Sequence, residues 1–219
     1  LHSAVAQRWR EVTGTPIAEG YGLTETSPVV SFNPLSGEPR LGSIGIPAPG
    51  TDVRLVSETG QDVPTGEPGE IWVRGPQVMQ GYWQNEVETA NVMHDGWFAT
   101  GDIGVMDAEG FFRIVDRKKD MIKSGGENVA SREVEEMIYR LPQVSEVAVI
   151  GLPDPKWVEA VTAVVVVKAG QTLDEATVIA HCAQHMAGFK APKRVIFTDT
   201  LPKNPSGKLL KRDLRVRYA

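Results

Sequence analysis

Five consecutive charged residues, DRKKD at 116–120, separate two stretches of this 219-residue chain that have different sequence patterns. Residues 42–116 are rich in turns and β-like, whereas helical and strand patterns alternate beyond the charged run. Strand patterns lie at 52–57, 69–75 and 111–115. Because few contacts cross such a hydrophilic stretch when it links domains, we predict a β-rich part, 1–116, a hinge near 116–120 and a second domain, 117–219. The alternative is a polar hairpin turn.

The second part has the pattern of a small α+β domain of roughly 100 residues. Its first helix is expected to begin at an N-cap, Ser131, and to stop before Pro142. The apolar positions of that helix, at i, i+3, i+4 and i+7, are Val134, Met137, Ile138 and Leu141. Strands are expected at 144–151, 160–167 and 194–198, with a second helix from Asp174 to Met186. The predicted fold class is α+β, with a three-stranded sheet and flanking helices in this domain.

Composition excludes several classes of protein. Hydrophobic residues make up 41% of the chain and charged residues 23%, as is typical of a soluble globular protein. One cysteine, Cys182, cannot form an internal disulfide and fits a reducing compartment. The longest apolar run, 160–167, is too short to cross a bilayer, so we expect no transmembrane segment and a cytoplasmic location.

The charge is concentrated at one end of the chain. Residues 190–219 contain nine Lys or Arg and two Asp, a charge of +7, which leaves −12 for the rest of a chain of net charge −5. A basic end on an acidic body favours an anionic ligand, although a solvated helix face is the alternative. Nucleic acid is not expected, because aromatic residues do not alternate with the basic ones. In a terminal helix, Leu210 and Leu214 would face inward, and four basic residues would be exposed: Lys211, Arg212, Arg215 and Arg217.

The segment GYGLTETSP, 20–28, has residues suited to binding a nucleotide. Glycines at 20 and 22 let backbone amides approach a ligand closely. Tyr21 offers a flat face for a base, Thr24 a hydroxyl, and Glu25 a carboxylate that could hold Mg²⁺ beside a phosphate. A glycine-rich turn ahead of a β region is the alternative.

Two further segments contain candidate ribose ligands. Asp102 follows Gly101 ahead of a predicted strand, where its carboxylate could accept hydrogen bonds from a ribose diol; an Asx-turn is the alternative. In DRKKDMIKSGGENV, Arg117 could reach a ribose or phosphate, and the SGG stretch forms an exposed loop that a narrow ligand could pass. A charged hairpin with a glycine tip explains the latter segment equally well.

Three other patterns do not support a site. PSGKL is not a phosphate-binding P-loop, because residue 202 is Pro and residue 209 is Leu. His181 and His185 lack the glutamate of a zinc-protease helix. Cys182 falls on the apolar face of that helix, so we expect it in the core.

The order of the segments is more specific than any one of them. YGLTE, ATGD, DRKKDMIKSGGENV with EVEE, and PKNPSGK closely resemble the AMP-forming acyl-CoA synthetases of the adenylate-forming superfamily, from about residue 14 onward. GPQVMQGYW and RIVDRKKDMI look most like bacterial fatty-acyl-CoA synthetases. The resemblance implies that a carboxylic acid and Mg-ATP form an acyl-adenylate and pyrophosphate, after which the thiol of coenzyme A displaces AMP.

The resemblance also implies roles for individual residues. Those for the nucleotide are Tyr21 and Gly22 at the adenine, Thr24 at the phosphate, Glu25 as the Mg²⁺ ligand, and Asp102 and Arg117 at the ribose. Those in the second domain are Lys119 as the hinge, Gly125 and Gly126 at the pantetheine tunnel, and Lys208 between the substrate carboxylate and the nucleotide. Such a cation lowers the barrier because adenylation brings two anions together.

The resemblance covers only the C-terminal portion of the family's sequence. Its Ser/Thr/Gly-rich phosphate loop and most of its acyl pocket lie upstream, so we expect residues 1–219 alone not to adenylate an acid. Where the family often has Tyr-Pro, this chain has Ala130-Ser131. Two alternatives stay open: an aryl-CoA ligase of the hydroxycinnamate type, and a stand-alone fragment without catalysis. The sequence makes no prediction of oligomeric state.

Overall fold

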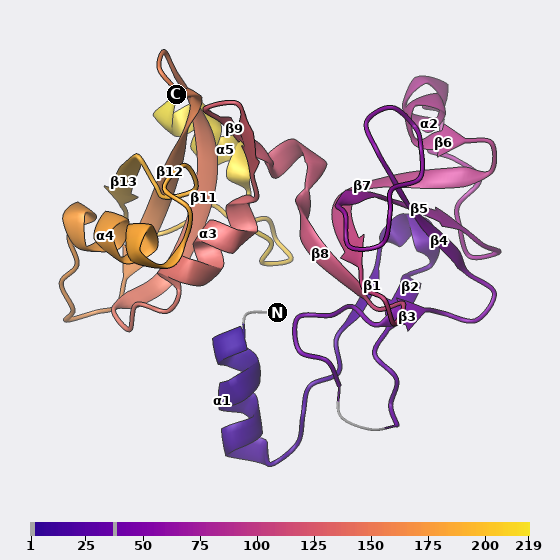
Figure 1. The fold of residues 1–219 in the computed structure, drawn as a ribbon, viewed down its shortest axis with the longest axis horizontal. Helices are drawn as coiled ribbons and strands as arrows, with labels where there is room; N and C mark the ends of the chain where they lie inside the picture. The colour runs from indigo at the N-terminus through magenta and orange to yellow at the C-terminus, as the bar shows by residue number, and fades with distance from the viewer. Residues whose placement is uncertain (1–2, 37–38) are drawn as a thin grey trace. The chain divides into compact units, whose positions relative to one another are not determined.

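The structure of the protein is a computed structural model, which describes residues 3–36 and 39–219 (Figure 1). The chain separates into two compact units, Leu1–Lys118 and Lys119–Ala219, which are described in turn. Both contain helices and sheets, so the predicted mixed α and β class is confirmed.

The first unit contains two sheets. A three-stranded sheet has the order β1 (Gly20–Gly22), β2 (Val29–Phe32), β3 (Ile46–Pro47). A five-stranded sheet has the order β4 (Asp52–Val56), β5 (Gly69–Arg74), β7 (Trp97–Met106), β6 (Met93–His94), and β8 (Phe112–Arg117) also pairs with β7. The helical elements are α1 (Ser3–Thr13), the 3₁₀ turn η1 (Thr24–Thr26) and α2 (Glu86–Val92).

The two sheets share one core. Buried apolar side chains from both are packed together: Val30, Ile44, Leu55, Ile71, Val73 and Phe112. Each such side chain contributes about 1.5–3 kcal/mol when fully buried. The predicted strands 52–57, 69–75 and 111–115 match β4, β5 and β8 within two residues at each end, because their apolar residues alternate with the period of a strand.

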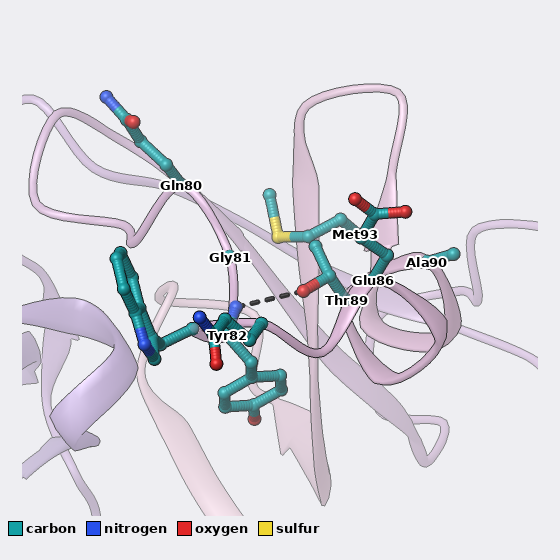
Figure 2. A pocket seen from close by; sticks show the side chains of 9 residues that line it. Gln80, Gly81, Tyr82, Glu86, Thr89, Ala90 and Met93 are labelled. Atoms are coloured by element: carbon teal, nitrogen blue, oxygen red, sulfur yellow. Dashed lines mark hydrogen bonds between the residues drawn. The ribbon is translucent and has the colours of Figure 1, made fainter.

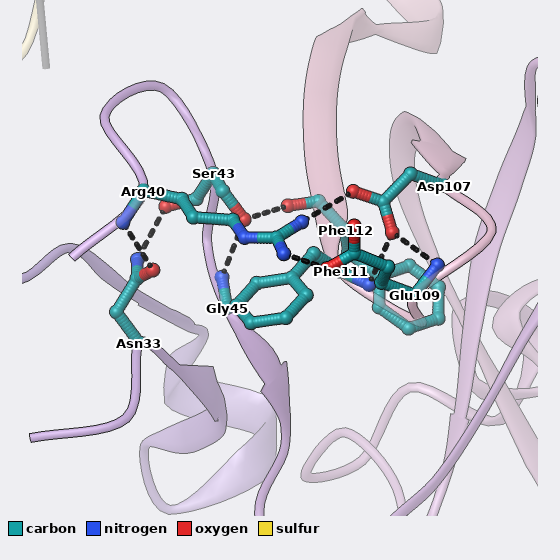
Figure 3. Close-up of polar contacts among 8 residues, drawn as sticks. All are labelled: Asn33, Arg40, Ser43, Gly45, Asp107, Glu109, Phe111 and Phe112. Carbon is teal, nitrogen blue, oxygen red and sulfur yellow. Dashed lines mark hydrogen bonds and ion pairs between the residues drawn. The ribbon is translucent and has the colours of Figure 1, made fainter. Parts of the chain in front are cut away.

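The chain around Arg40 is held against the turn between β7 and β8 (Figure 3). The Arg40 guanidinium pairs with the carboxylates of Asp107 and Glu109 and lies 3.8 Å from the ring centroid of Phe111. The Asn33 amide donates to the Ser43 carbonyl at 2.7 Å, while its oxygen accepts from the Arg40 amide at 3.1 Å. This fastening holds the three-stranded sheet beside β8.

The second unit is built on a mixed sheet of five strands. Its order is β10 (Glu127–Val129), β9 (Ile122–Ser124), β12 (Val158–Val167), β11 (Val144–Asp154), and β13 (Arg194–Phe197) pairs with β12 in parallel. The predicted three strands correspond to β11, β12 and β13. The expected strand count was too low, because β9 and β10 are three residues each and carry too little periodicity to be recognised.

Helices cover both faces of this sheet. Helices α3 (Ser131–Ile138) and α4 (Glu175–His185) pack on one face with Val147 and Val149 of β11. On the other face Leu214 of α5 (Lys211–Tyr218) packs with Ala148 and Ile150. Because β11 and β12 are buried on both sides, their sequences are continuous apolar runs.

The starts of helices α4 and α3 were not predicted equally well. The predicted helix from Asp174 to Met186 corresponds to α4, and Asp174 is its N-cap, with a side chain that accepts from the Thr177 amide at 2.7 Å. The prediction of Ser131 as an N-cap was wrong. The N-cap of α3 is Ala130, which has no side-chain cap, and the Ser131 hydroxyl instead accepts from Lys211 Nζ at 2.6 Å.

The expectation for the terminal helix was wrong for two of its four basic residues. The Lys211 side chain is only 14% exposed and pairs with Glu135 at 2.7 Å. Arg215 pairs with Asp120 at 2.8 Å, next to Lys119 in the 3₁₀ turn η2 (Lys118–Asp120). Only Arg212 and Arg217 lie on the exposed side, so part of the tail's charge holds α5 in place.

Candidate functional site

The glycine-rich segment forms β1 and the turn η1 that follows it. A Cβ atom at Gly22 would lie 1.7 Å from the Pro28 carbonyl oxygen, so only glycine fits where the chain folds back on itself. The buried hydroxyl of Thr26 donates to the Pro28 carbonyl at 2.8 Å and accepts from the Leu23 amide at 3.0 Å. These contacts present Thr24, which is exposed, and Glu25, which is partly buried, on a rigid turn.

Tyr21, Asp102 and Arg117 come together at the edge of this turn. The Tyr21 hydroxyl donates to Asp102 Oδ2 at 2.6 Å, and Arg117 Nε lies 3.6 Å from Asp102 Oδ1. Asp102 and Arg117 are directly opposite on β7 and β8. Asp102 lies inside β7 and not ahead of a strand, and its carboxylate contacts both Tyr21 and Arg117.

Burial and electrostatics fix the protonation of Tyr21. Burial and the neighbouring Asp102 carboxylate raise the pKa of Tyr21 far above its ordinary value. The phenol therefore stays a hydrogen-bond donor at any working pH. The Asp102 carboxylate is oriented by a phenol on one side and a guanidinium on the other. In this orientation it can accept hydrogen bonds from the hydroxyl groups of a polar ligand.

Glu25, the predicted magnesium ligand, contacts the segment that contains Met79 and Tyr82. Its Oε1 accepts from the Tyr82 hydroxyl at 3.0 Å, and its backbone carbonyl accepts from the Met79 amide at 2.8 Å. No cluster of three or more His, Cys, Asp or Glu suited to a metal occurs among residues 3–36 and 39–219.

A cavity of about 490 Å³ borders Tyr82 (Figure 2). It is lined by Gln80, Gly81, Tyr82, Trp83, Gln84, Glu86, Thr89, Ala90 and Met93. Tyr82 lies in the phrase GPQVMQGYW, and the sequence alone assigns it no role. The sequence feature that could have indicated a role for Tyr82 is its position between a glycine and a second aromatic residue. That pattern is too common to identify a functional residue.

Lys208 lies in the exposed bend that precedes α5. Asn204 organises that bend: its Oδ1 accepts from the Ser206 hydroxyl at 2.8 Å and from the Lys208 amide at 2.8 Å. Lys203 and Leu209 form a β-bridge that closes it. Lys208 is exposed, and none of the ion pairs found within the described ranges involves it. Asn204 was missed, although Asn before Pro-Ser-Gly is typical of an Asx-turn.

Gly125 and Gly126 form the tip of the hairpin between β9 and β10, in agreement with the simpler of the two interpretations of this segment. A Cβ atom at Gly125 would lie 3.1 Å from the Trp157 ring, and the Gly125 amide donates to the Trp157 carbonyl at 2.9 Å. Both glycines have positive φ. Lys119 is exposed in η2, at the first residue of the second unit.

Sequence comparison assigns the chain to a family. The family model for AMP-binding enzymes matches residues 1–83, and the model for the AMP-binding enzyme C-terminal domain matches residues 133–208. The chain belongs to the AMP-binding enzyme family. The resemblance inferred from the four ordered segments is thereby confirmed.

Individual members of the AMP-binding family are similar over nearly the whole chain. A long-chain-fatty-acid–CoA ligase of Yersinia pestis is 52% identical over 98% of this chain and 38% of its own length. A feruloyl-CoA synthase of Amycolatopsis is 47% identical over 94% of the chain and 42% of its own. ATP-bound MatB from Rhodopseudomonas palustris is 41% identical, with a TM-score of 0.94 over 98% of this chain and 43% of that one. The chain thus spans about two fifths of these relatives.

Among residues 3–36 and 39–219, no helix combines the length and apolar character needed to span a bilayer.

Proposed function

We propose that this chain is part of an ATP-dependent, AMP-forming acyl-CoA synthetase. The observation that carries the proposal is the Tyr21–Asp102–Arg117 group, in which a buried carboxylate is oriented at 2.6 Å by a phenol and faced by a guanidinium. Such a carboxylate suits the hydroxyls of a ribose. The ATP-bound relative, which has the same fold over this chain, supports ATP as the ligand.

The residues of the first unit would bind and orient the nucleotide. Tyr21 and Gly22 would flank the adenine, Thr24 would contact a phosphate, and Asp102 and Arg117 would hold the ribose. Glu25 would hold Mg²⁺, which when bound neutralises phosphate charge and orients the reacting phosphate. Holding the acid and ATP in line contributes to the rate, because binding has already removed most of the translational and rotational freedom of the two reactants.

In the second unit, Lys208 would lie between the substrate carboxylate and the α-phosphate during adenylation. Two unit charges about 4 Å apart interact by ~1 kcal/mol in bulk water but ~4 kcal/mol at an effective dielectric of 20. The lysine would therefore act mainly in a cleft from which water is excluded. A rotation about Lys119 would withdraw it, and Gly125 and Gly126 would then line the path of the pantetheine thiol.

The acid is proposed to be a fatty acid, because the Yersinia relative is a long-chain-fatty-acid–CoA ligase. An aryl acid of the hydroxycinnamate type is the second candidate, supported by the feruloyl-CoA synthase. Cys182 is free and buried, as suits a reducing compartment, and a cytoplasmic location is part of the proposal.

The test is release of pyrophosphate by the polypeptide that the whole gene encodes. A panel of fatty acids of increasing length and of hydroxycinnamates is supplied with Mg-ATP, with and without coenzyme A. We expect acid-dependent pyrophosphate release, and AMP with an acyl-CoA when coenzyme A is present. Release for no acid on the panel would contradict the proposal and favour a protein without catalysis.

A second arm uses residues 1–219 alone. Because this chain spans 38% of the length of the Yersinia ligase, we expect it not to form acyl-CoA from ATP. Robust acyl-CoA formation by residues 1–219 would show that the nucleotide site needs nothing beyond them.

A further inference from the structure

We propose that Tyr82 is a positioning residue, which holds the carboxylate of Glu25 so that one oxygen is left to bind a divalent cation beside the nucleotide. This inference rests on the proposed function but assigns a role to a residue outside the four segments on which that function depends.

Tyr82 and Glu25 are joined by a side-chain hydrogen bond, and a backbone hydrogen bond joins the segments around them. The Tyr82 hydroxyl donates to Glu25 Oε1 at 3.0 Å. In the backbone, the Met79 amide donates to the Glu25 carbonyl at 2.8 Å. Tyr82 and Glu25 are 57 positions apart in the sequence. The backbone hydrogen bond fixes the position of η1 against residues 79–82. The side-chain hydrogen bond then fixes the direction of the Glu25 carboxylate.

Tyr82 is itself held from the other side, by α2. Its amide donates to Thr89 Oγ1 at 2.9 Å, as Figure 2 shows, and that hydroxyl donates to the Asn85 carbonyl at 2.8 Å. Asn85 is the N-cap of α2, and its side chain accepts from the Glu88 amide. The helix therefore anchors the backbone of Tyr82, and the phenol reaches from this anchor to Glu25.

The chemistry of the two groups assigns them different roles. The phenol of Tyr82 carries the proton of this bond and donates it to Glu25 Oε1. An ionised carboxylate only accepts, and the phenol satisfies Oε1. No hydrogen bond or ion pair within the described part of the chain occupies Glu25 Oε2. That oxygen is the one available to a cation, and loss of a hydrogen bond that orients a metal ligand typically costs 10–100-fold in metal affinity.

A purely structural role for the bond makes a different prediction. If the hydroxyl only fastened the loop, its loss would lower stability and leave cation affinity unchanged. Cation affinity therefore has to be measured separately from activity and from stability.

The experiment compares Tyr82→Phe with the unaltered full polypeptide. Binding of Mn²⁺ is followed by electron paramagnetic resonance in the presence of α,β-methylene-ATP, and binding of ATP is measured separately in excess EDTA. We expect Mn²⁺ to bind about tenfold more weakly to Tyr82→Phe. Affinity for metal-free ATP should change less than twofold.

The matched control is Tyr139→Phe. It deletes a hydroxyl that donates to the Ser145 carbonyl at 3.2 Å in the second unit, and it should leave Mn²⁺ affinity unchanged. Equal weakening of Mn²⁺ binding in both variants would contradict the inference.

A double-mutant cycle keeps the test decisive if Tyr82→Phe is also less stable. Because the phenol acts through Glu25, the double variant with Glu25→Gln should bind Mn²⁺ no more weakly than Glu25→Gln alone. Additive losses of Mn²⁺ affinity in the double variant, or unchanged Mn²⁺ affinity in Tyr82→Phe, would overturn the inference. The proposed function would still be supported by pyrophosphate release from the unaltered protein. Failure of the unaltered protein to bind Mn²⁺ with the nucleotide would overturn both.

Discussion

The Tyr21 hydroxyl lies 2.6 Å from Asp102 Oδ2, although 81 residues separate the two in the sequence. Arg117 faces the other oxygen of the same carboxylate at 3.6 Å. A residue proposed to flank the adenine therefore also orients the residue proposed to hold the ribose, so the two halves of a nucleoside would be recognised by one connected group.

Deleting the Tyr21 hydroxyl should weaken recognition of the ribose. A hydrogen bond to a charged group contributes about 1.5–3 kcal/mol, so Tyr21→Phe should raise KM for ATP by about tenfold. The preference for ATP over 2′-deoxy-ATP should fall as well, because Asp102 would no longer be held in one orientation. Steady-state pyrophosphate release with the two nucleotides measures both. An unchanged preference would show that the bond has only a structural role.

Lys208 should matter for one half-reaction only. Lys208→Ala removes the cation proposed to lie between two anions, and we expect adenylation to slow by about 10²–10³-fold, while transfer from supplied acyl-adenylate to coenzyme A is retained. Single-turnover assays of each half-reaction make the comparison. The control is Lys203→Ala, which removes a lysine of the same bend that pairs with Glu146 at 2.6 Å. Equal loss in both half-reactions of Lys208→Ala would contradict the role.

Arg215 should stabilise the second unit more than its basic neighbour Arg212. Arg215→Ala leaves the nearly buried Asp120 carboxylate without the guanidinium at 2.8 Å, so we expect a loss of about 1–3 kcal/mol in the free energy of unfolding. Arg212 is exposed, and Arg212→Ala should change stability by about 0.5 kcal/mol or less. Urea denaturation of the full chain measures both variants. Similar values would mean that the whole tail is a solvated face.

Replacing Val158 with glycine should stabilise the protein. Val158 has a φ of +68°, a left-handed conformation that is strained for a β-branched residue, and its side chain is largely exposed. Val158→Gly should relieve about 1–2 kcal/mol of strain, offset in part by the greater entropy of glycine in the unfolded chain. A small rise in Tm is the expected result. A fall in Tm would show that the Val158 backbone is not strained.

Cys182 should resist modification in the folded protein. Burial raises the pKa of its thiol from the ordinary 9.0 to about 11, so at pH 8 it is protonated as well as inaccessible. Iodoacetamide should leave it unmodified until urea unfolds the chain, as mass spectrometry would detect. Because the folded-state pKa is the higher one, the stability associated with this thiol is fully present below pH 9 and is lost as pH rises toward 11. Rapid labelling at pH 8 without urea would contradict this account.

Local sequence patterns were sufficient for many of the elements. The alternation in 52–57 and 69–75 predicted β4 and β5, and the predicted helix from Asp174 to Met186 corresponds to α4. These features depend on residues a few positions apart, whose spacing and capping chemistry are written in the sequence. The ordered segments likewise led to the AMP-binding family, which the two family models confirm.

Other features were decided by contacts between distant segments. No local pattern distinguishes Lys211 and Arg215, which are tied to Glu135 and Asp120, from the exposed Arg212.

The sequence by itself determined the family, the residue types of the candidate site, and a set of elements that depend on near neighbours in the chain: strands β4, β5, β8, β11, β12 and β13 and helices α3, α4 and α5. Only the tertiary structure decided that Tyr21 orients Asp102 and that Tyr82 holds Glu25. Those pairs are 81 and 57 residues apart, and their meeting depends on how the sheets pack and on where each turn directs its side chains.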